Sequence, residues 1–273
     1  MALCFPGPAH PASGLSPTRY GGAVSGIVFL ADAHLRGRSD PAQHVLVEFL
    51  RSLPDRPGGV VVLGDLFEYF AGRNRRATFE YEPVLRQLER FAPFHYLEGN
   101  HDFDLCPRWL GLPPEFVHPG PACLALAGVR VLLRHGDRAD PRDLGTRCLR
   151  GALQSAPLRW LRDRVLPDGS VFEFAMRFAS FSRRNAWPGR GREAAELQAW
   201  MRRRMAAGGA RIGIFAHTHQ GLLRRVEEGL LANPGRAVLG GSYLELDGDR
   251  LCLRAFPGGE ALHPGPLPLR PEP

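Results

Sequence analysis

The chain has 273 residues, of which 44% are hydrophobic, 23% charged and 9% aromatic, a composition that excludes a disordered or fibrous protein. Its longest apolar runs, such as Ile27–Ala31 and Val129–Leu133, are far shorter than the roughly 18 residues of a bilayer-spanning helix. The formal net charge of +7 comes from arginine alone, because the sequence contains no lysine. The length predicts one sizeable domain, or a core domain that carries a smaller insertion.

Both ends of the chain are rich in turn-forming residues. Residues 1–25 lack the basic start and the continuous apolar stretch of a signal peptide, so we expect a flexible N-terminal tail. Residues 259–273 contain several prolines without periodicity and are predicted to be a C-terminal tail. The five cysteines are scattered and form no C-x-x-C pair, which is typical of reduced thiols in a cytoplasmic protein.

Short apolar runs alternate with helical patterns up to residue 137. In chain order we expect a strand at Ile27–Ala31, a helix at Pro41–Arg51, a strand at Val60–Leu63, a helix at Thr78–Phe91, a strand at Phe94–Leu97 and a hairpin of Cys123–Leu126 with Val129–Leu133. A helical block follows, and strands are predicted again at Ile212–Phe215, Leu222–Val226, Ala237–Leu246 and Leu251–Phe256. The pattern predicts an α/β core formed by residues 26–137 and 208–258, with a helical cap inserted at 138–207.

The predicted cap concentrates the positive charge. Between Arg138 and Arg204 fifteen arginines face seven acidic residues, a net +8, whereas the rest of the chain carries about −1. A charge run alone is usually a solvated helix face, but this segment also carries apolar residues at helical spacing. These are Val171, Phe174, Phe178 and Phe181 on one predicted helix, and Leu197, Trp200 and Met201 on another. Such stripes suit either ordinary packing or an amphiphilic ligand.

Five short polar blocks each follow directly after an apolar strand. They are Asp32-Ala33-His34, Gly64-Asp65, Gly99-Asn100-His101-Asp102, His135-Gly136-Asp137 and His217-Thr218-His219. Because the carboxyl ends of strands in an open α/β sheet line the ligand crevice, we expect these residues to converge. Carboxylate and imidazole ligands suit Mn, Fe and Zn, and a mixed set around two ions is used for displacement at phosphorus. Asp65 is the natural bridging ligand.

Each block alone is weak, since a single histidine near a strand end is usually structural, but the ordered set is specific. Together the blocks resemble the calcineurin-like metallophosphoesterase superfamily. The resemblance implies a β-sandwich flanked by helices, with two divalent metal ions, most readily Mn²⁺, with Fe or Zn as alternatives. It further implies that one metal is held by Asp32, His34, Asp65 and His219, and the other by Asp65, Asn100, His135 and His217. By the same resemblance His101 faces the leaving group and Asp102 fixes its orientation.

A closer similarity lies in Gly64-Asp65-Leu66-Phe67-Glu68, followed by Gly72, and in Gly99-Asn100-x-Asp102-Phe103. These segments resemble the bacterial UDP-2,3-diacylglucosamine hydrolases, peripheral membrane enzymes of lipid A synthesis with a helical cap after H-G-D. The resemblance implies manganese-dependent hydrolysis of a pyrophosphate to UMP and lipid X. It also implies an amphiphilic nucleotide-lipid substrate, contact with the anionic cytoplasmic face of the inner membrane, and no nucleic-acid partner. The chain departs from that family at His101, where Arg is usual, and at Gly221, where Pro is usual.

The cap supplies the expected substrate contacts. Arg177, Arg183, Arg184 and Asn185 are the candidates, because guanidinium groups pair bidentately with phosphate oxygens.

Two other functions remain open. An arginine-rich cap would also attract a nucleotide, a nucleic acid or a phosphoprotein, in which case binding should weaken steeply with salt. A non-catalytic scaffold with the phosphoesterase fold is the alternative outside the enzymes, and the complete set of seven ligands argues against it.

Overall fold

The computed structural model describes residues 26–137, 154–184 and 190–269, and no side chain from 180 to 192. The expected tail at 1–25 and a large part of the predicted cap therefore lie outside the described residues. Among the helices of the described segments, none is both long and apolar enough to cross a bilayer.

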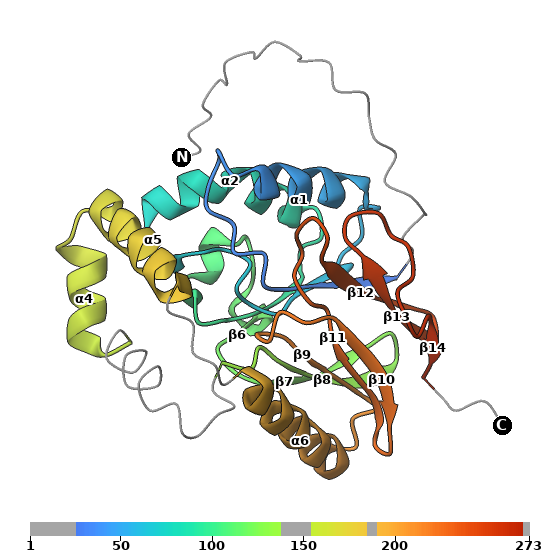
Figure 1. The fold of residues 1–273 in the computed structure, drawn as a ribbon. Coiled ribbons are helices and arrows are strands. Elements are labelled where there is room, and N and C mark those ends of the chain that lie inside the picture. The colour runs from blue at the N-terminus through green and yellow to red at the C-terminus, as the bar shows by residue number, and fades with distance from the viewer. Residues whose placement is uncertain (1–25, 138–153, 185–189, 270–273) are drawn as a thin grey trace.

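Two sheets form a sandwich (Figure 1). The first has the strand order β14-β13-β12-β1-β2-β4-β6, and the second β10-β11-β9-β8-β7. In the first sheet the strands are β1 (Ile27–Leu30), β2 (Val60–Val62), β4 (His95–Leu97), β6 (Val117–His118), β12 (Ser242–Asp247), β13 (Arg250–Ala255) and β14 (Leu267–Pro268). In the second they are β7 (Ala122–Leu126), β8 (Val129–Arg134), β9 (Ile212–Phe215), β10 (Leu222–Val226) and β11 (Gly229–Asn233). A separate pair joins β3 (Phe70–Gly72) to β5 (Asp102–Leu105).

Alternation of side chains along each strand explains the layers. Phe29 on β1 and Val61 on β2 point between the sheets, where they meet Val131 of β8 and Ile212 of β9. Their neighbours Val28, Leu30, Val60 and Val62 point to the opposite face and pack under helices. Because successive side chains of a strand face opposite sides, these wholly apolar strands are buried on both faces.

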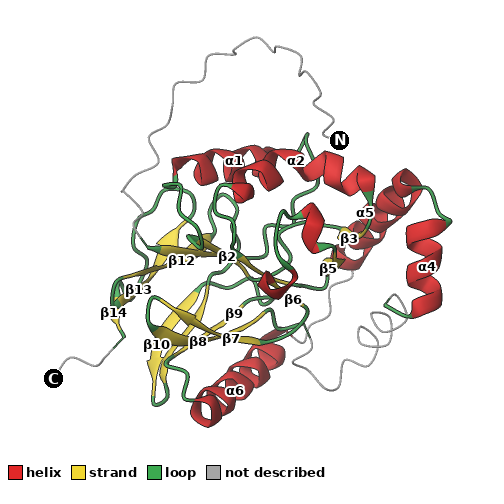
Figure 2. Cartoon of the chain, turned by 180° about the vertical axis from the view of Figure 1, so that it is seen from behind, coloured by secondary structure: helices red, strands yellow, loops and turns green. Residues whose placement is uncertain are grey.

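The helices cover the outer faces of the sandwich (Figure 2). The first sheet is covered by α1 (Pro41–Ser52) and α2 (Arg75–Glu89), which begin after the capping side chains of Asp40 and Asn74. The second sheet is covered by α6 (Arg190–Gly208), whose Leu197, Met201 and Met205 are fully buried against β8, β9 and β11. Two single-turn helices lie at Pro107–Trp109 and Pro114–Phe116. These layers confirm the predicted α/β sandwich with flanking helices.

Two helices of the predicted cap project beside the sandwich (Figure 1). They are α4 (Ala156–Arg164) and α5 (Asp168–Arg184). Arg162 of α4 donates to Asp104 of β5 at 3.1 Å. At the start of α5, Asp168 accepts from the backbone of Arg75, and its carbonyl accepts from Asn74. The cap helices are therefore anchored to β5 and to the start of α2.

The structure corrects one boundary of the expected cap and shows which part of its apolar stripe is buried. First, α6 packs on the second sheet, so the end of the 138–207 segment belongs to the sandwich. Second, the buried face of α5 consists of Phe172 and Ala179, with the partly buried Met176, whereas Phe174 and Phe178 of the predicted stripe are 71% and 47% exposed. Phe181 lies outside the described side chains.

Other differences concern short strands and turns. The strand expected from Ala237 begins only at Ser242, because residues 237–241 form a turn; a Cβ on Gly241 would lie 2.0 Å from the Arg236 carbonyl. The strands β3, β5, β6 and β11 were not predicted. In the expected C-terminal tail, β14 pairs with β13 and Leu269 is buried, so that prediction is wrong up to residue 269.

Candidate metal centre

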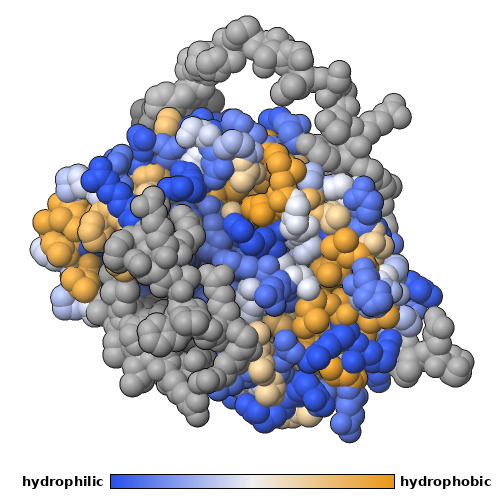
Figure 3. All heavy atoms as spheres, viewed as in Figure 1, coloured by the Kyte–Doolittle hydropathy of each residue, from blue (hydrophilic) through white to orange (hydrophobic). Residues whose placement is uncertain are grey.

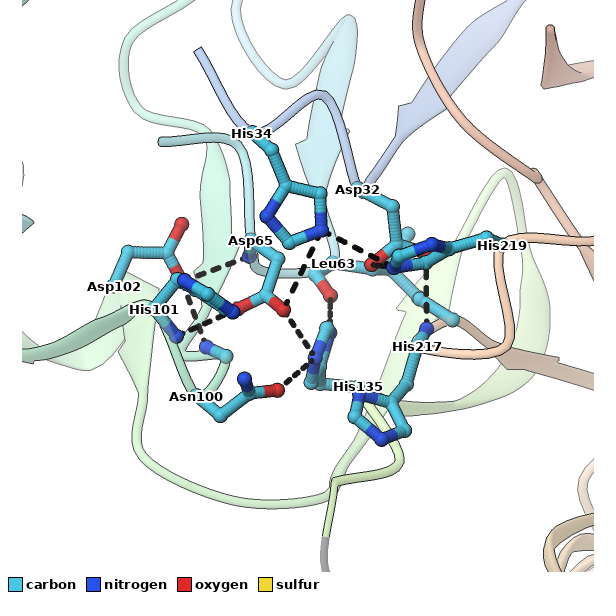
Figure 4. A network of polar contacts seen from close by, with 12 residues as sticks. Asp32, His34, Leu63, Asp65, Asn100, His101, Asp102, His135, His217 and His219 are labelled. Atoms are coloured by element: carbon cyan, nitrogen blue, oxygen red, sulfur yellow. Dashed lines mark hydrogen bonds and ion pairs between the residues drawn. The ribbon is translucent and has the colours of Figure 1, made fainter. Parts of the chain in front are cut away.

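The predicted ligands meet at one end of the sandwich, where β1, β2, β8 and β9 finish (Figure 4). The strand ends converge because β1 is parallel to β2, and β8 is parallel to β9. Asp32, Asp65 and His135 are almost completely buried. The loop geometry is tight: a Cβ on Gly99 would lie 2.1 Å from an Asp65 carboxylate oxygen, so only glycine fits there.

Five of the seven predicted ligands have a left-handed backbone. The φ angles are 52° for Asp32, 48° for His34, 52° for Asp65, 69° for His217 and 61° for His219. This conformation costs roughly 1–3 kcal/mol for a residue with a side chain, and it persists only where the surroundings impose it. Here the surroundings are the paired loops, in which the amide of His34 donates to the Asp65 carbonyl at 3.0 Å. The strained backbone turns successive side chains toward the same point.

A first cluster contains Asp32, His34 and His219. Nε2 of His34 lies 3.1 Å from Nε2 of His219, and the latter lies 3.8 Å from Oδ1 of Asp32. Burial lowers the pKa of His34 well below its usual range; burial, and after it the charge of Arg236, lowers that of His219 to about 4. Both imidazoles are therefore neutral near pH 7, the form that binds a cation.

A second cluster contains Asp65, His135 and His217, with Asn100 beside it. Nε2 of His135 lies 3.3 Å from both Asp65 Oδ2 and Asn100 Oδ1. Its other nitrogen, Nδ1, bonds to the Leu63 carbonyl at 2.7 Å, which fixes the ring with Nε2 toward the cluster. Asp65 is also 3.9 Å from His34, so it lies between the two clusters as a bridging ligand must.

The donor atoms fit divalent cations. Among the described residues, the buried atoms Asp32 Oδ1, Asp65 Oδ2 and His217 Nδ1 make no hydrogen bond. Buried polar atoms without a partner are costly, and a shared cation would satisfy them together. The structure thus brings the seven predicted ligands together, while their assignment to two ions stays a prediction.

Asp102 has a different place from the one expected. Its carboxylate accepts hydrogen bonds from the amides of Asp65, Leu66 and Gly99 and from the Tyr96 hydroxyl, at 2.6–2.9 Å. The prediction that it orients His101 is therefore wrong. Asp102 instead holds the Gly64-Asp65 and Gly99-Asn100 loops together.

His101 is oriented by Glu68. The His101 ring places Nδ1 2.9 Å from the Glu68 carbonyl and 3.8 Å from its carboxylate. Because Nδ1 is engaged as a donor, Nε2 is left for a ligand. The ring is 4.7 Å from that of His34, centroid to centroid, and His34, Asp65 and His101 offer donor atoms close enough to share a cation, so its place outside the ligand set stays a prediction.

Glu193 is a functional candidate that the sequence patterns missed. It lies in the first turn of α6, and its Oε1 is 3.0 Å from Nε2 of His217. Nε2 bonds Glu193, and Nδ1, which is buried without a hydrogen-bond partner, is the nitrogen left for a cation. A carboxylate behind a metal-binding imidazole orients it and raises its basicity. No sequence motif marks this pair, because 24 residues separate its members.

The expected substrate contacts lie mostly beyond what the structure describes. Arg177 is exposed on α5, away from any described partner. Arg183 and Arg184 end α5, and their side chains lie outside the described residues, as does all of Asn185. Their role stays a prediction.

Comparison with known proteins agrees with this geometry. The calcineurin-like phosphoesterase family matches residues 26–221. This chain belongs to that family. The matched segment contains every predicted metal ligand, and so the resemblance drawn from the five blocks is confirmed.

Among individual relatives, the chain is 35% identical over 141 residues to the UDP-2,3-diacylglucosamine hydrolase of Aeromonas salmonicida, covering 49% of this chain and 54% of the relative. It is 30% identical over 166 residues to the same hydrolase of Ralstonia nicotianae, covering 56% and 61%. The chain thus spans little more than half the length of the curated relatives it matches. A solved phosphoesterase from E. coli, Yfce, is 18% identical, with a TM-score of 0.47 and coverage of 89% and 99%.

The Glu193 contact predicts an effect on metal affinity. Glu193→Gln removes the charge behind His217, so we expect manganese affinity to fall about 10–100-fold. Titration calorimetry measures it directly. Glu196→Gln, one turn along α6, is the matched control and should leave the affinity unchanged. Equal affinities in all three proteins would show that Glu193 does not support the metal.

Metal binding should also depend on pH. Burial raises the pKa of Asp32 to about 7; although burial opposes it, the Asp65 charge raises that of His135 to about 9. Both groups hold protons in the metal-free protein below these values, and a cation must displace them. Affinity should therefore rise from pH 6 to pH 9, with roughly one to two protons released at pH 7. Calorimetry in buffers of different ionisation enthalpy counts them, and zero release contradicts the assignment.

Proposed function

We propose that this protein is a dinuclear-metal hydrolase that cleaves the pyrophosphate bond of UDP-2,3-diacylglucosamine to UMP and lipid X. The observation that carries the proposal is the pair of Asp/His clusters with Asp65 between them, 3.9 Å from His34 and 3.3 Å from His135. The matched relatives, which bear the name of this hydrolase, support the substrate. Manganese is the cation we expect, with Fe or Zn as alternatives.

The protein supplies geometry and proton transfer. Two bound cations would activate a water and neutralise charge on the attacked phosphate. In the reaction the water oxygen bonds to one phosphorus, the bond from that phosphorus to the bridging oxygen breaks, and the leaving phosphate departs with the electron pair. His101 donates from Nδ1 to the Glu68 carbonyl, and in its protonated form the ring also carries a proton on Nε2 that can pass to the leaving oxygen.

The cap offers a surface for acyl chains. Figure 3 shows apolar residues gathered over α4 and α5 at the left edge of the molecule. Phe174 and Phe178 stack with their ring centroids 6.3 Å apart, and Arg177 is exposed next to Phe178. Phe172 on the inner face packs near Tyr69, the residue after Glu68. The cap helix is thus fixed one residue away from the group that orients His101.

The same face suits a membrane surface. The exposed large apolar residues of these helices and of the turn between them are Leu158, Trp160, Val165, Leu166, Phe174 and Phe178. Arginines 159, 164 and 177 lie among them, and such a mixture binds an anionic lipid interface through burial and charge together. This supports peripheral contact with the cytoplasmic face of the inner membrane and a cytoplasmic location.

The catalytic roles can be separated by two variants. His101→Ala should lower kcat about 10²–10⁴-fold and leave the metal content unchanged, because the proposal places His101 outside the metal ligands. Asp65→Ala should lose both metal and turnover, because one carboxylate bridges both clusters. Turnover of UDP-2,3-diacylglucosamine is measured beside manganese content. Wild-type protein that is loaded with manganese and hydrolyses a nucleotide or nucleic acid but not this lipid would overturn the proposed substrate.

The exposed phenylalanines give a test of the cap. Phe178→Asp should raise KM for a long-chain lipid about 10–100-fold, the loss of one buried aromatic contact, and hardly change hydrolysis of bis(p-nitrophenyl) phosphate. The melting temperature should not change, since the side chain is half exposed. Phe79→Asp on α2, also exposed, is the control. A lowered melting temperature with equal losses on both substrates would show that Phe178 is ordinary packing.

A further inference from the structure

A hollow of about 340 Å³ opens beside His219, which lies across the site from His101 (Figure 4). Its walls come from the turn between β11 and β12 and from two residues near β13. They are Arg236, Val238, Leu239, Ser242, Leu253 and Leu262. The hollow therefore joins the edge of the first Asp/His cluster to an apolar wall.

Arg236 is the charged group of this hollow. Its side chain is exposed, and no carboxylate or carbonyl of the described residues pairs with its guanidinium. Other arginines are engaged: Arg162 bonds Asp104, and Arg254 bonds Glu245. Arg236 and His219 line the same hollow, so the guanidinium stands beside the first Asp/His cluster without a protein anion of the described residues to pair with.

The turn that carries Arg236 is fixed to the histidine loop. Asn233 donates to Thr218 Oγ1 at 2.9 Å and accepts from the Gly235 amide at 2.7 Å. The Arg236 carbonyl accepts from the Ser242 amide at 2.9 Å. A Cβ on Gly235 would lie 3.0 Å from the Gly221 amide, so the two loops are in close contact. The backbone of Arg236 therefore has a defined position relative to His219.

We propose that Arg236 and this hollow form a subsite for an organic phosphate. The guanidinium binds an anionic oxygen of the phosphoryl group at the metal centre, because Arg pairs bidentately with phosphate. The apolar wall of Val238, Leu239 and Leu262 contacts the organic group attached to that phosphate. The inference rests on the proposed phosphoesterase chemistry of the metal centre, and not on the identity of the lipid.

Two phosphonates that resist hydrolysis test both halves of the subsite. Methylphosphonate presents the anion almost alone, and phenylphosphonate adds an apolar ring. Their binding to the manganese-loaded full chain is measured by calorimetry. The wild type should bind phenylphosphonate about 3–10-fold more tightly, because the ring buries apolar surface in the hollow.

Single substitutions test the guanidinium and the apolar wall of the subsite separately. Arg236→Ala should weaken both phosphonates about 10–100-fold, the loss of a charged hydrogen-bond donor, and Arg236→Lys should lose less. Leu239→Ser, at a side chain 65% exposed, should remove only the preference for the ring. Arg51→Ala on α1 and Phe79→Ser on α2 are exposed controls that should behave as the wild type.

Manganese content and melting temperature accompany each titration. If Arg236→Ala keeps its manganese and binds both phosphonates as the wild type does, the subsite is wrong. If the variant loses manganese, Arg236 supports the metal centre and the subsite is wrong as well. If the phosphonate pattern holds while UDP-2,3-diacylglucosamine is not hydrolysed, the subsite stands and the proposed substrate fails.

Discussion

Two carboxylates buried side by side govern this structure. Asp32 and Asp65 are both fully buried, and burial together with the Asp65 charge raises the pKa of Asp32 to about 7. Isolated buried charges are very costly unless they are paired or bind metals. The protein meets part of that cost with backbone donors: the His101 amide bonds Asp65 and the His217 amide bonds Asp32. The remaining carboxylate oxygens face imidazoles, which leaves a set of donors that suits divalent cations.

The backbone around these carboxylates departs from the conformations that residues with side chains usually adopt. Five ligand residues adopt the left-handed conformation that glycine prefers, and Asp102, a third buried carboxylate, pins the surrounding loops through three amides and one hydroxyl. The regular part of the fold supplies the stability that offsets this strain, because strands apolar on both faces lie directly before the loops. Sites of this kind are where departures from ideal geometry are expected.

The sequence predicted those parts of the site in which metal-binding residue types follow directly after a strand. The convergence of Asp32, Asp65 and His135 follows from parallel strands that finish at one edge, and this could be predicted. The partners of Asp102 and Glu193 could not, because hydrogen bonds between distant segments leave no spacing in the chain. The sequence left open whether the α5 stripe packs or faces a ligand, since Phe172 and Phe174 both fit a helical period; packing in the core beside α2 buries Phe172, whereas Phe174 is exposed. Short strands such as β14 were missed because pairing with β13, rather than propensity, forms them.

The position of Glu193 links the inserted cap segment to the metal centre. The inserted segment begins directly after His135-Gly136-Asp137, and α6, which follows it, carries Glu193 in its first turn against His217. One helix thus serves as the outer layer of the second sheet and as a support for the metal centre. A cap that is exchanged between relatives must therefore be joined to the core at defined points of the chain. A donor cap joined after Asp137 and before α6 keeps the support, whereas one that replaces the start of α6 exchanges part of the active centre along with the substrate surface.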